Sequence, residues 1–243
     1  MDDVNSSTAL ITGATSGIGN EIARQLTARG WTVLLGARDV ERGEQVATEM
    51  GGRVLLLDVT DAASVAAAAA AVPTLDVLVN NAGISLDTAA VVTEVDVEVF
   101  RHTYETNVFG VVTVTNAFLP ALRRSARPRI VNVSSGTGSL TWSTGPNPQF
   151  DFRAAGTGRG AAYRSSKTAL DALTVFYAQA LAGDGIKVNA LAPGLRATNL
   201  NAQAAAAGGD PAEAAAGAVR LATLPDDGPT GLLFSWDGTV APW

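Results

Sequence analysis

The chain has 243 residues with 17 basic and 23 acidic side chains, and its net charge of −6 argues against a polyanion-binding surface and against a nucleic-acid partner. It contains no cysteine and a single histidine, His102, which excludes a thiol nucleophile, a disulfide framework and a zinc centre built on several imidazoles. We therefore predict no metal site. Oxygen acids, lysine and backbone groups must carry any chemistry.

Short β-branched runs alternate with longer helical segments along the chain. We expect strands at residues 8–12, 31–37, 53–57, 75–79, 129–133, 187–191 and 231–235. We expect helices at residues 17–29, 40–50, 62–72, 94–124 and 161–182, with Asp61 as the N-cap of the third. The strands read as continuous apolar runs such as VLLG, VLLL and RIVNV, which predicts a parallel sheet covered by helices on both faces.

Two segments interrupt this alternation. Residues 136–160 are rich in Gly, Pro, Ser and Thr, and residues 195–217 are rich in Ala and Gly, so we expect an insertion followed by a mobile substrate loop with short helices. No repeat or linker divides the chain, which predicts one dinucleotide-binding and catalytic domain over residues 1–243. The first residues lack the basic region and apolar core of a signal peptide, and no apolar run reaches the ~20 residues of a membrane span. We expect a cytoplasmic protein without a membrane partner.

A glycine-rich turn lies between the first strand and the first helix, with the sequence TGATSGIG. Glycine permits a tight turn and lets the backbone approach a pyrophosphate, and the helix N-terminus offers free N–H groups and a partial positive charge. The spacing is GxxxGxG rather than the usual GxGxxG, and a plain turn is the alternative. The setting favours a dinucleotide-binding loop formed by Gly13, Thr15, Ser16, Gly17, Ile18 and Gly19.

Cofactor choice is read at the end of the second strand. Sites that prefer NAD place an acid there to bind the ribose hydroxyls, whereas this chain has Leu35, Gly36 and Ala37 followed by Arg38. A guanidinium binds a 2′-phosphate through two hydrogen bonds. NADPH is therefore the preferred cofactor, with NADH possible, because Arg38 could instead be solvated or neutralised by Asp39.

Two later motifs, NNAG at residues 80–83 and YRSSK at residues 163–167, make the chain resemble the classical short-chain dehydrogenases/reductases. The resemblance spans essentially the whole sequence and includes the TGxxxGIG loop, Asp58-Val59, Asn107, the VSS run ending at Ser135, and Pro193-Gly194. It implies a Rossmann-type, doubly wound α/β fold with a mainly seven-stranded parallel sheet. It also implies hydride exchange between a nicotinamide and an alcohol or carbonyl substrate.

The resemblance implies a catalytic set of Asn107, Ser135, Tyr163 and Lys167. Tyr163 and Lys167 are four residues apart and hence neighbours on one helical face. A free tyrosine has a pKa near ~10, and a nearby ammonium and the cationic nicotinamide are expected to lower it, so that Tyr163 exchanges a proton with the substrate oxygen. Ser135 would hydrogen-bond that oxygen, and Asn107 would hold a water that links Lys167 to solvent.

Further cofactor contacts are implied by the same family pattern. The loop after residue 192 resembles the segment that clamps the nicotinamide amide, although Arg196 replaces the more usual aliphatic residue and its side chain inherits no role. His102 is expected at the surface or an interface. The implied cofactor contacts besides the glycine loop and Arg38 are Asp58, Val59, Asn81, Ala82, Gly83, Tyr163, Lys167, Pro193, Gly194 and Thr198.

Ser135 and Tyr163 are separated by 28 positions, and this lengthened segment resembles that of monomeric carbonyl reductases. We therefore expect a monomer in which the insertion disfavours the usual four-helix dimer. The leading interpretation is a reductase for a ketone, aldehyde or quinone. An NAD-dependent alcohol dehydrogenase working oxidatively and a non-catalytic dinucleotide sensor are the alternatives, while 243 residues leave little room for the substrate domain of an extended epimerase. Expected pocket residues are Leu86, Trp142, Phe150, Phe152 and Leu195.

Overall fold

The computed structural model describes residues 7–87, 90–147, 158–206 and 209–243. One sheet has the strand order β3-β2-β1-β4-β5-β6-β7-β8, with β8 antiparallel to β7 and all other neighbours parallel. This confirms the predicted doubly wound sheet of seven parallel strands. The strands are β1 (Thr8–Thr12), β2 (Thr32–Ala37), β3 (Arg53–Leu56), β4 (Val77–Asn80), β5 (Arg129–Val133), β6 (Lys187–Ala192), β7 (Leu233–Ser235) and β8 (Val240–Ala241).

The helices follow the predicted pattern with three differences: a break in the fourth, a short helix at Leu140–Thr144 within the insertion, and a late helix at Pro211–Ala222. The expected helix over residues 94–124 is divided by a π-helical turn at Glu105–Phe109, and short 3-10 turns lie at Val92–Glu94 and Ala182–Asp184. The α-helices are α1 (Gly17–Thr27), α2 (Val40–Met50), α3 (Ala62–Ala70), α4 (Val97–Tyr104), α5 (Gly110–Leu122), α6 (Leu140–Thr144), α7 (Ala161–Ala180), α8 (Ala202–Ala206) and α9 (Pro211–Ala222).

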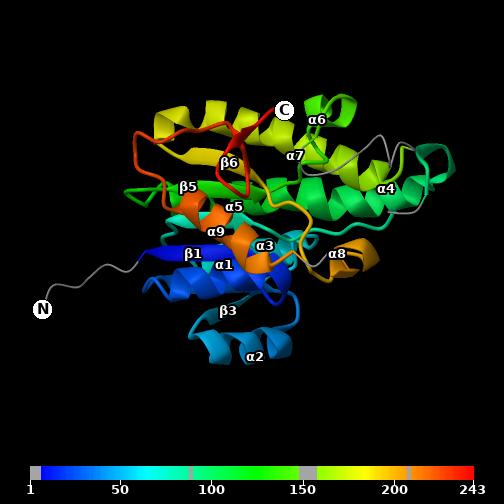
Figure 1. The fold of residues 1–243 in the computed structure, drawn as a ribbon. Coiled ribbons are helices and arrows are strands. Elements are labelled where there is room, and N and C mark those ends of the chain that lie inside the picture. Colours follow the sequence, from blue (N-terminus) through cyan, green and yellow to red (C-terminus); the bar gives the residue numbers. More distant parts are fainter. Residues whose placement is uncertain (1–6, 88–89, 148–157, 207–208) are drawn as a thin grey trace, which may run out of the picture.

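Apolar side chains of the central strands point alternately to two separate cores. In β1, Ile11 packs with Ile22 and Leu26 of α1, whereas Leu10 packs with Phe118 of α5 on the opposite face. Figure 1 shows α5 and α7 together on one side of the sheet and α1 with α9 on the other. Both faces are thus buried, which is the reason that the strands read as continuous apolar runs.

The edge strand β3 departs from that rule. Leu56 of its VLLL run is 54% exposed, and Val54 and Leu55 are half-buried. The run predicted burial on both faces, and this is wrong for β3 because it is the last strand of the sheet and has one neighbouring strand, β2.

The expectation of a loop with short helices over residues 195–217 is wrong for its second half. Helix α9 begins at Pro211, with Asp210 as its N-cap, and buries most of its length against the sheet and α1. A Cβ at Gly217 would lie 3.0 Å from Leu191 Cδ1 and 3.1 Å from the Trp236 carbonyl oxygen. Small residues therefore permit close helix packing here, and their weak hydrophobicity hid a core helix.

The order of strands reverses direction between β1 and β4, which are neighbours at the centre of the sheet. At such a switch point the loops after the two strands diverge and leave a crevice at the carboxyl ends, where α/β proteins bind ligands. Among the described residues, no helix combines the length and apolarity needed to cross a bilayer.

Candidate active site

The glycine-rich turn between β1 and α1 adopts conformations that favour glycine. Gly13 and Gly17 have positive φ angles of 63° and 56°. A Cβ at Gly19 would overlap the Asn81 side-chain nitrogen and lie 2.7 Å from the Gly13 carbonyl oxygen. Ser16 is the N-cap of α1 without a side-chain hydrogen bond, and in the described structure the first turn of α1 contains no acid. Its N–H groups therefore remain available to an anion.

Thr12 and Asn81 join this turn to the segment after β4. The Thr12 hydroxyl oxygen accepts hydrogen bonds from the backbone N–H groups of Asn81 and Ala82, at 2.9 and 3.0 Å. The Asn81 amide donates to the carbonyl oxygens of Thr12 and Gly13, at 2.9 and 3.1 Å. These four bonds fix the edges of the crevice, and no sequence motif had assigned Thr12 such a role.

A cleft of about 490 Å³, here called the glycine-loop cleft, lies along this edge of the sheet. It is lined by 16 of the predicted site residues, and Gly194 lies in the neighbouring pocket. Those 16 are Gly13, Thr15, Ser16, Gly17, Ile18, Gly19, Arg38, Asp58, Val59, Asn81, Ala82, Gly83, Tyr163, Lys167, Pro193 and Thr198.

The far end of the cleft carries two exposed guanidinium groups. Arg38 and Arg42 both line it, Arg38 just before α2 and Arg42 in its first turn. Asp39 between them caps α2 by accepting the Arg42 backbone N–H at 3.1 Å. Two hydrogen bonds from Thr60, helped by Arg38, hold the pKa of Asp58 below its ordinary value. The sequence interpretation missed Arg42, although its place in the first turn of the predicted helix that follows Arg38 was a usable signal.

Tyr163 and Lys167 line the cleft, and Ser135, which is hydrogen-bonded to Tyr163, lines the neighbouring pocket. The Lys167 ammonium donates to the Val133 carbonyl oxygen at 2.8 Å and lies 5.8 Å from the centre of the Tyr163 ring. Ser135 shares a 2.9 Å hydrogen bond with the hydroxyl of Thr137 and accepts the Thr137 backbone N–H at 3.2 Å. One turn of α7 thus brings its phenol and ammonium to the end of β5.

The electrostatics of this cluster differ from the prediction. Burial raises the pKa of Tyr163 to about 12, outweighing the lowering that its hydrogen bond with Ser135 provides, and the charge of Asp171 raises it further. Burial also lowers the pKa of Lys167 to about 8, against the opposing effect of Asp171. The expected lowering of the Tyr163 pKa is therefore wrong for the protein by itself, since desolvation outweighs the neighbouring groups.

Asn107 lies in the π-helical turn and is completely buried behind the cluster. Its side chain accepts the Ile84 backbone N–H and donates to the Ile84 carbonyl oxygen, both at 2.9 Å, and it also donates to the Ser166 hydroxyl at 3.0 Å. A Cβ at Gly83 would lie 3.3 Å from Asn107 Oδ1 and 3.6 Å from Lys167 Nζ. Asn107 thus holds the segment after β4 close to the lysine. Its predicted water contact stays a prediction.

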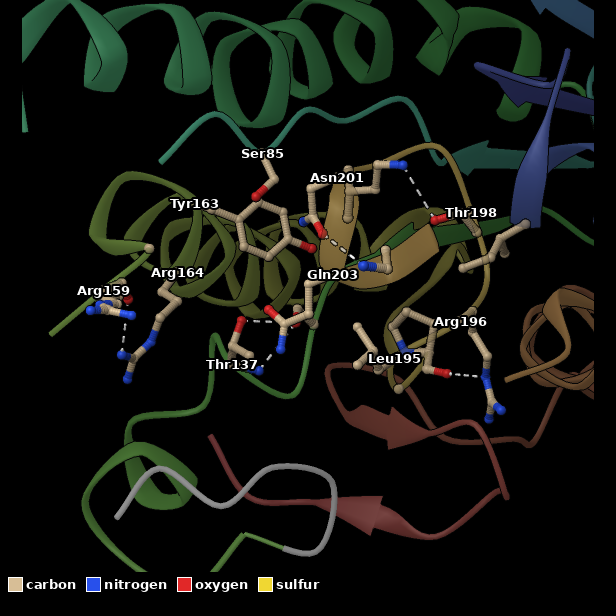
Figure 2. A pocket seen from close by; sticks show the side chains of 17 residues that line it. Ser85, Thr137, Arg159, Tyr163, Arg164, Leu195, Arg196, Thr198, Asn201 and Gln203 are labelled. Carbon is tan, nitrogen blue, oxygen red and sulfur yellow. Dashed lines mark hydrogen bonds between the residues drawn. The ribbon is translucent and has the colours of Figure 1, made fainter. Parts of the chain in front are cut away.

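A second cavity of about 390 Å³, here called the tyrosine pocket, opens beside the cleft and shares Tyr163 with it. Figure 2 shows Arg159 and Arg164 at one side of this pocket and Arg196 at the other. The buried Arg196 guanidinium forms an ion pair with the Glu213 carboxylate at 2.6 Å and donates to the Pro193 carbonyl oxygen. It also stacks on Trp236, with Cζ 4.3 Å from the ring centre. Its guanidinium therefore braces the loop after β6.

The predicted pocket residues are only partly correct. Leu195 lines the tyrosine pocket, but Leu86 is exposed outside it. Trp142 is buried in a small core with Leu233 and Ala241, because α6 packs beside the last strands. Phe150 and Phe152 lie outside the described residues. His102 is exposed on α4, as expected.

Asp87 is a positioning residue that the sequence interpretation missed. Its buried carboxylate accepts the backbone N–H groups of Ala162 at 2.6 Å and Tyr163 at 3.3 Å, which caps the first turn of α7 from the loop after β4. The residue at the helix start itself, Gly160, offers no side chain. Only the fold brings Asp87 there, so no local signal revealed it. Within the described residues no cluster of three or more His, Asp or Glu side chains could hold a metal ion.

A family model described as short chain dehydrogenase matches residues 7–147 and 154–208. Galactitol 2-dehydrogenase (L-tagatose-forming) of Cereibacter sphaeroides is 34% identical over 97% of this chain and 95% of its own length. The NADPH-bound carbonyl reductase from chicken fatty liver superposes with a TM-score of 0.83 and 28% identity, covering 98% of this chain and 99% of that one. The 3-ketoacyl-(acyl-carrier-protein) reductase from Brucella melitensis, complexed with NADH, gives a TM-score of 0.80 and 28% identity, covering 94% and 96%.

Proposed function

The chain belongs to the short-chain dehydrogenase/reductase family of NAD(P)-dependent oxidoreductases, and we propose that it is an NADPH-dependent reductase that converts a ketone, aldehyde or quinone carbonyl to an alcohol. The observation that carries this proposal is the place of Tyr163, which lines both the glycine-loop cleft and the tyrosine pocket. A proton donor at the junction of two cavities can serve a substrate in one and a cofactor in the other.

The glycine-loop cleft fits a dinucleotide. Gly13 and Gly17 hold a turn that most side chains would strain, a Cβ at Gly19 would overlap Asn81, and the N-terminus of α1 faces the cleft. Backbone N–H groups of this turn would hold the pyrophosphate, and Asn81 to Gly83 would flank the path toward Tyr163. When bound, the nicotinamide supplies or accepts the hydride.

The residues of the chain would supply the proton and orient the substrate. The Tyr163 hydroxyl gives its proton to the carbonyl oxygen, and Ser135 Oγ donates a hydrogen bond that fixes the same oxygen. Lys167, held by the Val133 carbonyl oxygen, places a positive charge beside the phenol and stabilises the phenolate left behind. In the oxidative direction Tyr163 takes the proton from the alcohol instead.

Two arginines favour NADPH over NADH. Arg38 and Arg42 line the far end of the cleft, where Ala37 occupies the position of the ribose-binding acid and Asp39 is engaged in capping α2. Substitution Arg38→Ala should weaken NADPH by roughly 10- to 100-fold, the worth of a charge-assisted hydrogen bond of ~1.5–3 kcal/mol. NADH affinity should change little, because it has no phosphate to lose. Equal effects on the two cofactors would refute the pairing.

A second candidate is an NAD-dependent alcohol dehydrogenase working oxidatively, and the 34% identity to a galactitol dehydrogenase favours it. A third, non-catalytic dinucleotide sensing, is disfavoured by the presence of Asn107, Ser135, Tyr163 and Lys167 together. A panel of ketones, aldehydes, quinones and polyols, assayed in both directions with both cofactors by nicotinamide absorbance, separates the three. A sensor would bind NADPH and turn over nothing.

We also propose a monomer in the cytoplasm, on the strength of the lengthened segment between Ser135 and Tyr163. Two exposed aromatic rings favour a dimer instead. Phe109 and Phe176 are 52% and 60% exposed on the α4, α5 and α7 side of the molecule, and pairing of these helices with a second copy would cover them. Light scattering decides the assembly: one chain mass supports the proposal, and a stable dimer or tetramer sinks it. Cell fractionation tests the location.

A further inference from the structure

A buried acid lies behind the catalytic pair and has no part in the reaction as described above. Asp171 follows Lys167 by four residues and Tyr163 by eight, so the three side chains share one face of α7. The side chains of Asp171 and Lys167 are each only 4% exposed. The site therefore contains a second ionisable layer beneath the tyrosine.

The Asp171 carboxyl is held from the end of β5. Ser134 Oγ donates to Asp171 Oδ1 at 2.5 Å, and Ser134 is the residue directly before Ser135. The turn after β5 covers the other oxygen, since a Cβ at Gly138 would lie 2.8 Å from Asp171 Oδ2 and 3.0 Å from Lys167 Cβ. Within the described residues Oδ2 has no hydrogen-bond partner.

Such a group is costly in a merely structural position. Burying a carboxyl with one oxygen unsatisfied costs on the order of a few kcal/mol, and an apolar side chain of similar volume would pack α7 against β5 at least as well. Ser134 satisfies only Oδ1. The remaining favourable interaction of Asp171 is with the charge of Lys167, one turn away.

In the part of the chain that the structure describes, the groups around the pair are otherwise uncharged. The π-helical turn presents Asn107, the end of β5 presents Ser134, Ser135 and the Val133 carbonyl oxygen, and the turn after β5 presents Gly138. The one charged residue of β6, Lys187, lies opposite Arg129 in the β5–β6 register, at the far end of the strands. Among the described residues, the titratable groups beside Asp171 are therefore Lys167 and Tyr163.

We propose that Asp171 is a positioning residue whose buried carboxylate keeps Lys167 protonated beside Tyr163, while its bond to Ser134 ties the end of β5 to α7. Burial raises the pKa of Asp171 to about 7 and lowers that of Lys167 to about 8, and each charge opposes the effect of burial on the other. Asp171 thus becomes a carboxylate just below the pH at which Lys167 would lose its proton. The role of Asp171 in catalysis rests on the proposed function, but the titration that tests its effect on Lys167 does not.

The composition of the chain permits a direct test, because Lys167 and Lys187 are its only two lysines. Lysine labelled with carbon-13 at Cε gives two signals in the cofactor-free protein, and Lys187→Arg assigns them. Asp171→Asn, which keeps an acceptor for Ser134 but removes the charge, should move the Lys167 titration midpoint down by roughly one pH unit. Asp184→Asn, which removes an exposed carboxylate beyond the end of α7, should leave it unchanged.

An unchanged midpoint in Asp171→Asn overturns the proposal, and so does an equal shift in Asp184→Asn. Should Asp171→Asn fail to fold, the parent still decides: its Lys167 signal should titrate in two steps, the smaller one near pH 7 as Asp171 ionises, and a single step overturns the proposal. With a substrate in hand, the alkaline limb of the pH–rate profile should move to lower pH in Asp171→Asn and coincide with the parent below about pH 7. Absence of turnover would refute the proposed function and leave the lysine titration standing.

Discussion

Removal of the Asp87 carboxylate should loosen the start of α7 and displace Tyr163. Asp87 accepts the Ala162 N–H at 2.6 Å and the Tyr163 N–H at 3.3 Å, and Ala162 is fully buried, so Asp87→Ala leaves at least one donor without a partner or water. The short bond to a charged acceptor contributes ~1.5–3 kcal/mol and the longer one about 0.5–1 kcal/mol. We therefore expect a loss of about 2–4 kcal/mol in the free energy of unfolding.

In a chain of this size each kcal/mol corresponds to about 2–4 °C, so Tm should fall by roughly 5–15 °C. Calorimetry gives this value, and steady-state kinetics at saturating cofactor gives the accompanying loss in kcat. Asp61→Ala is the matched control: Asp61 caps α3 through a single exposed bond to the Ala63 N–H, at 2.9 Å, and its loss should cost only about 1 kcal/mol with kcat intact. If the two variants melt alike and turn over alike, the capping argument is refuted.

Three further substitutions test other parts of the site. Gly19→Ala should lower cofactor affinity at least ~10-fold because the new Cβ overlaps Asn81, whereas Gly183→Ala, with no atom within 4 Å of its Cβ, should bind normally in the same fluorescence titration. Asn107→Leu removes three buried hydrogen bonds and should reduce both Tm and kcat, and a variant with parental kcat would show that Asn107 is not needed to hold the segment after β4. The pKa of Lys167 falls from 10.5 in the unfolded chain to about 8 in the folded protein. Between pH 8 and 10 the unfolded chain therefore binds more protons than the folded protein, and the free energy of unfolding should rise with pH. Urea titrations should show this slope in the parent and not in Lys167→Met.

The parallel sheet could be read from the sequence because its strands are buried on both faces and appear as apolar runs. The same rule misjudged Leu56, since an edge strand with an exposed face reads like a central one. Helix α9 was missed because alanine and glycine pack closely without strong hydrophobicity.

The site divides in the same way. Tyr163, Lys167 and the glycine loop lie within short motifs, so the family resemblance that these motifs carry was enough to predict them. Asp87 reaches Tyr163 from another loop, and only tertiary structure brings it there. Asp171 follows Lys167 by four residues on the same helix, but its burial and its hydrogen bond from Ser134 depend on the packing of α7 against β5. Burial also raises the pKa of Tyr163, whereas the sequence motif predicted that this pKa would be lowered.

Tyr163 is the proposed proton donor when a carbonyl is reduced, and Tyr163→Phe removes the hydroxyl that would supply this proton. NADPH consumption should be followed with the best carbonyl of the panel, alongside NADPH affinity by fluorescence. We expect kcat to fall roughly 10²- to 10⁴-fold with NADPH binding retained. A variant that consumes NADPH as fast as the parent would contradict it.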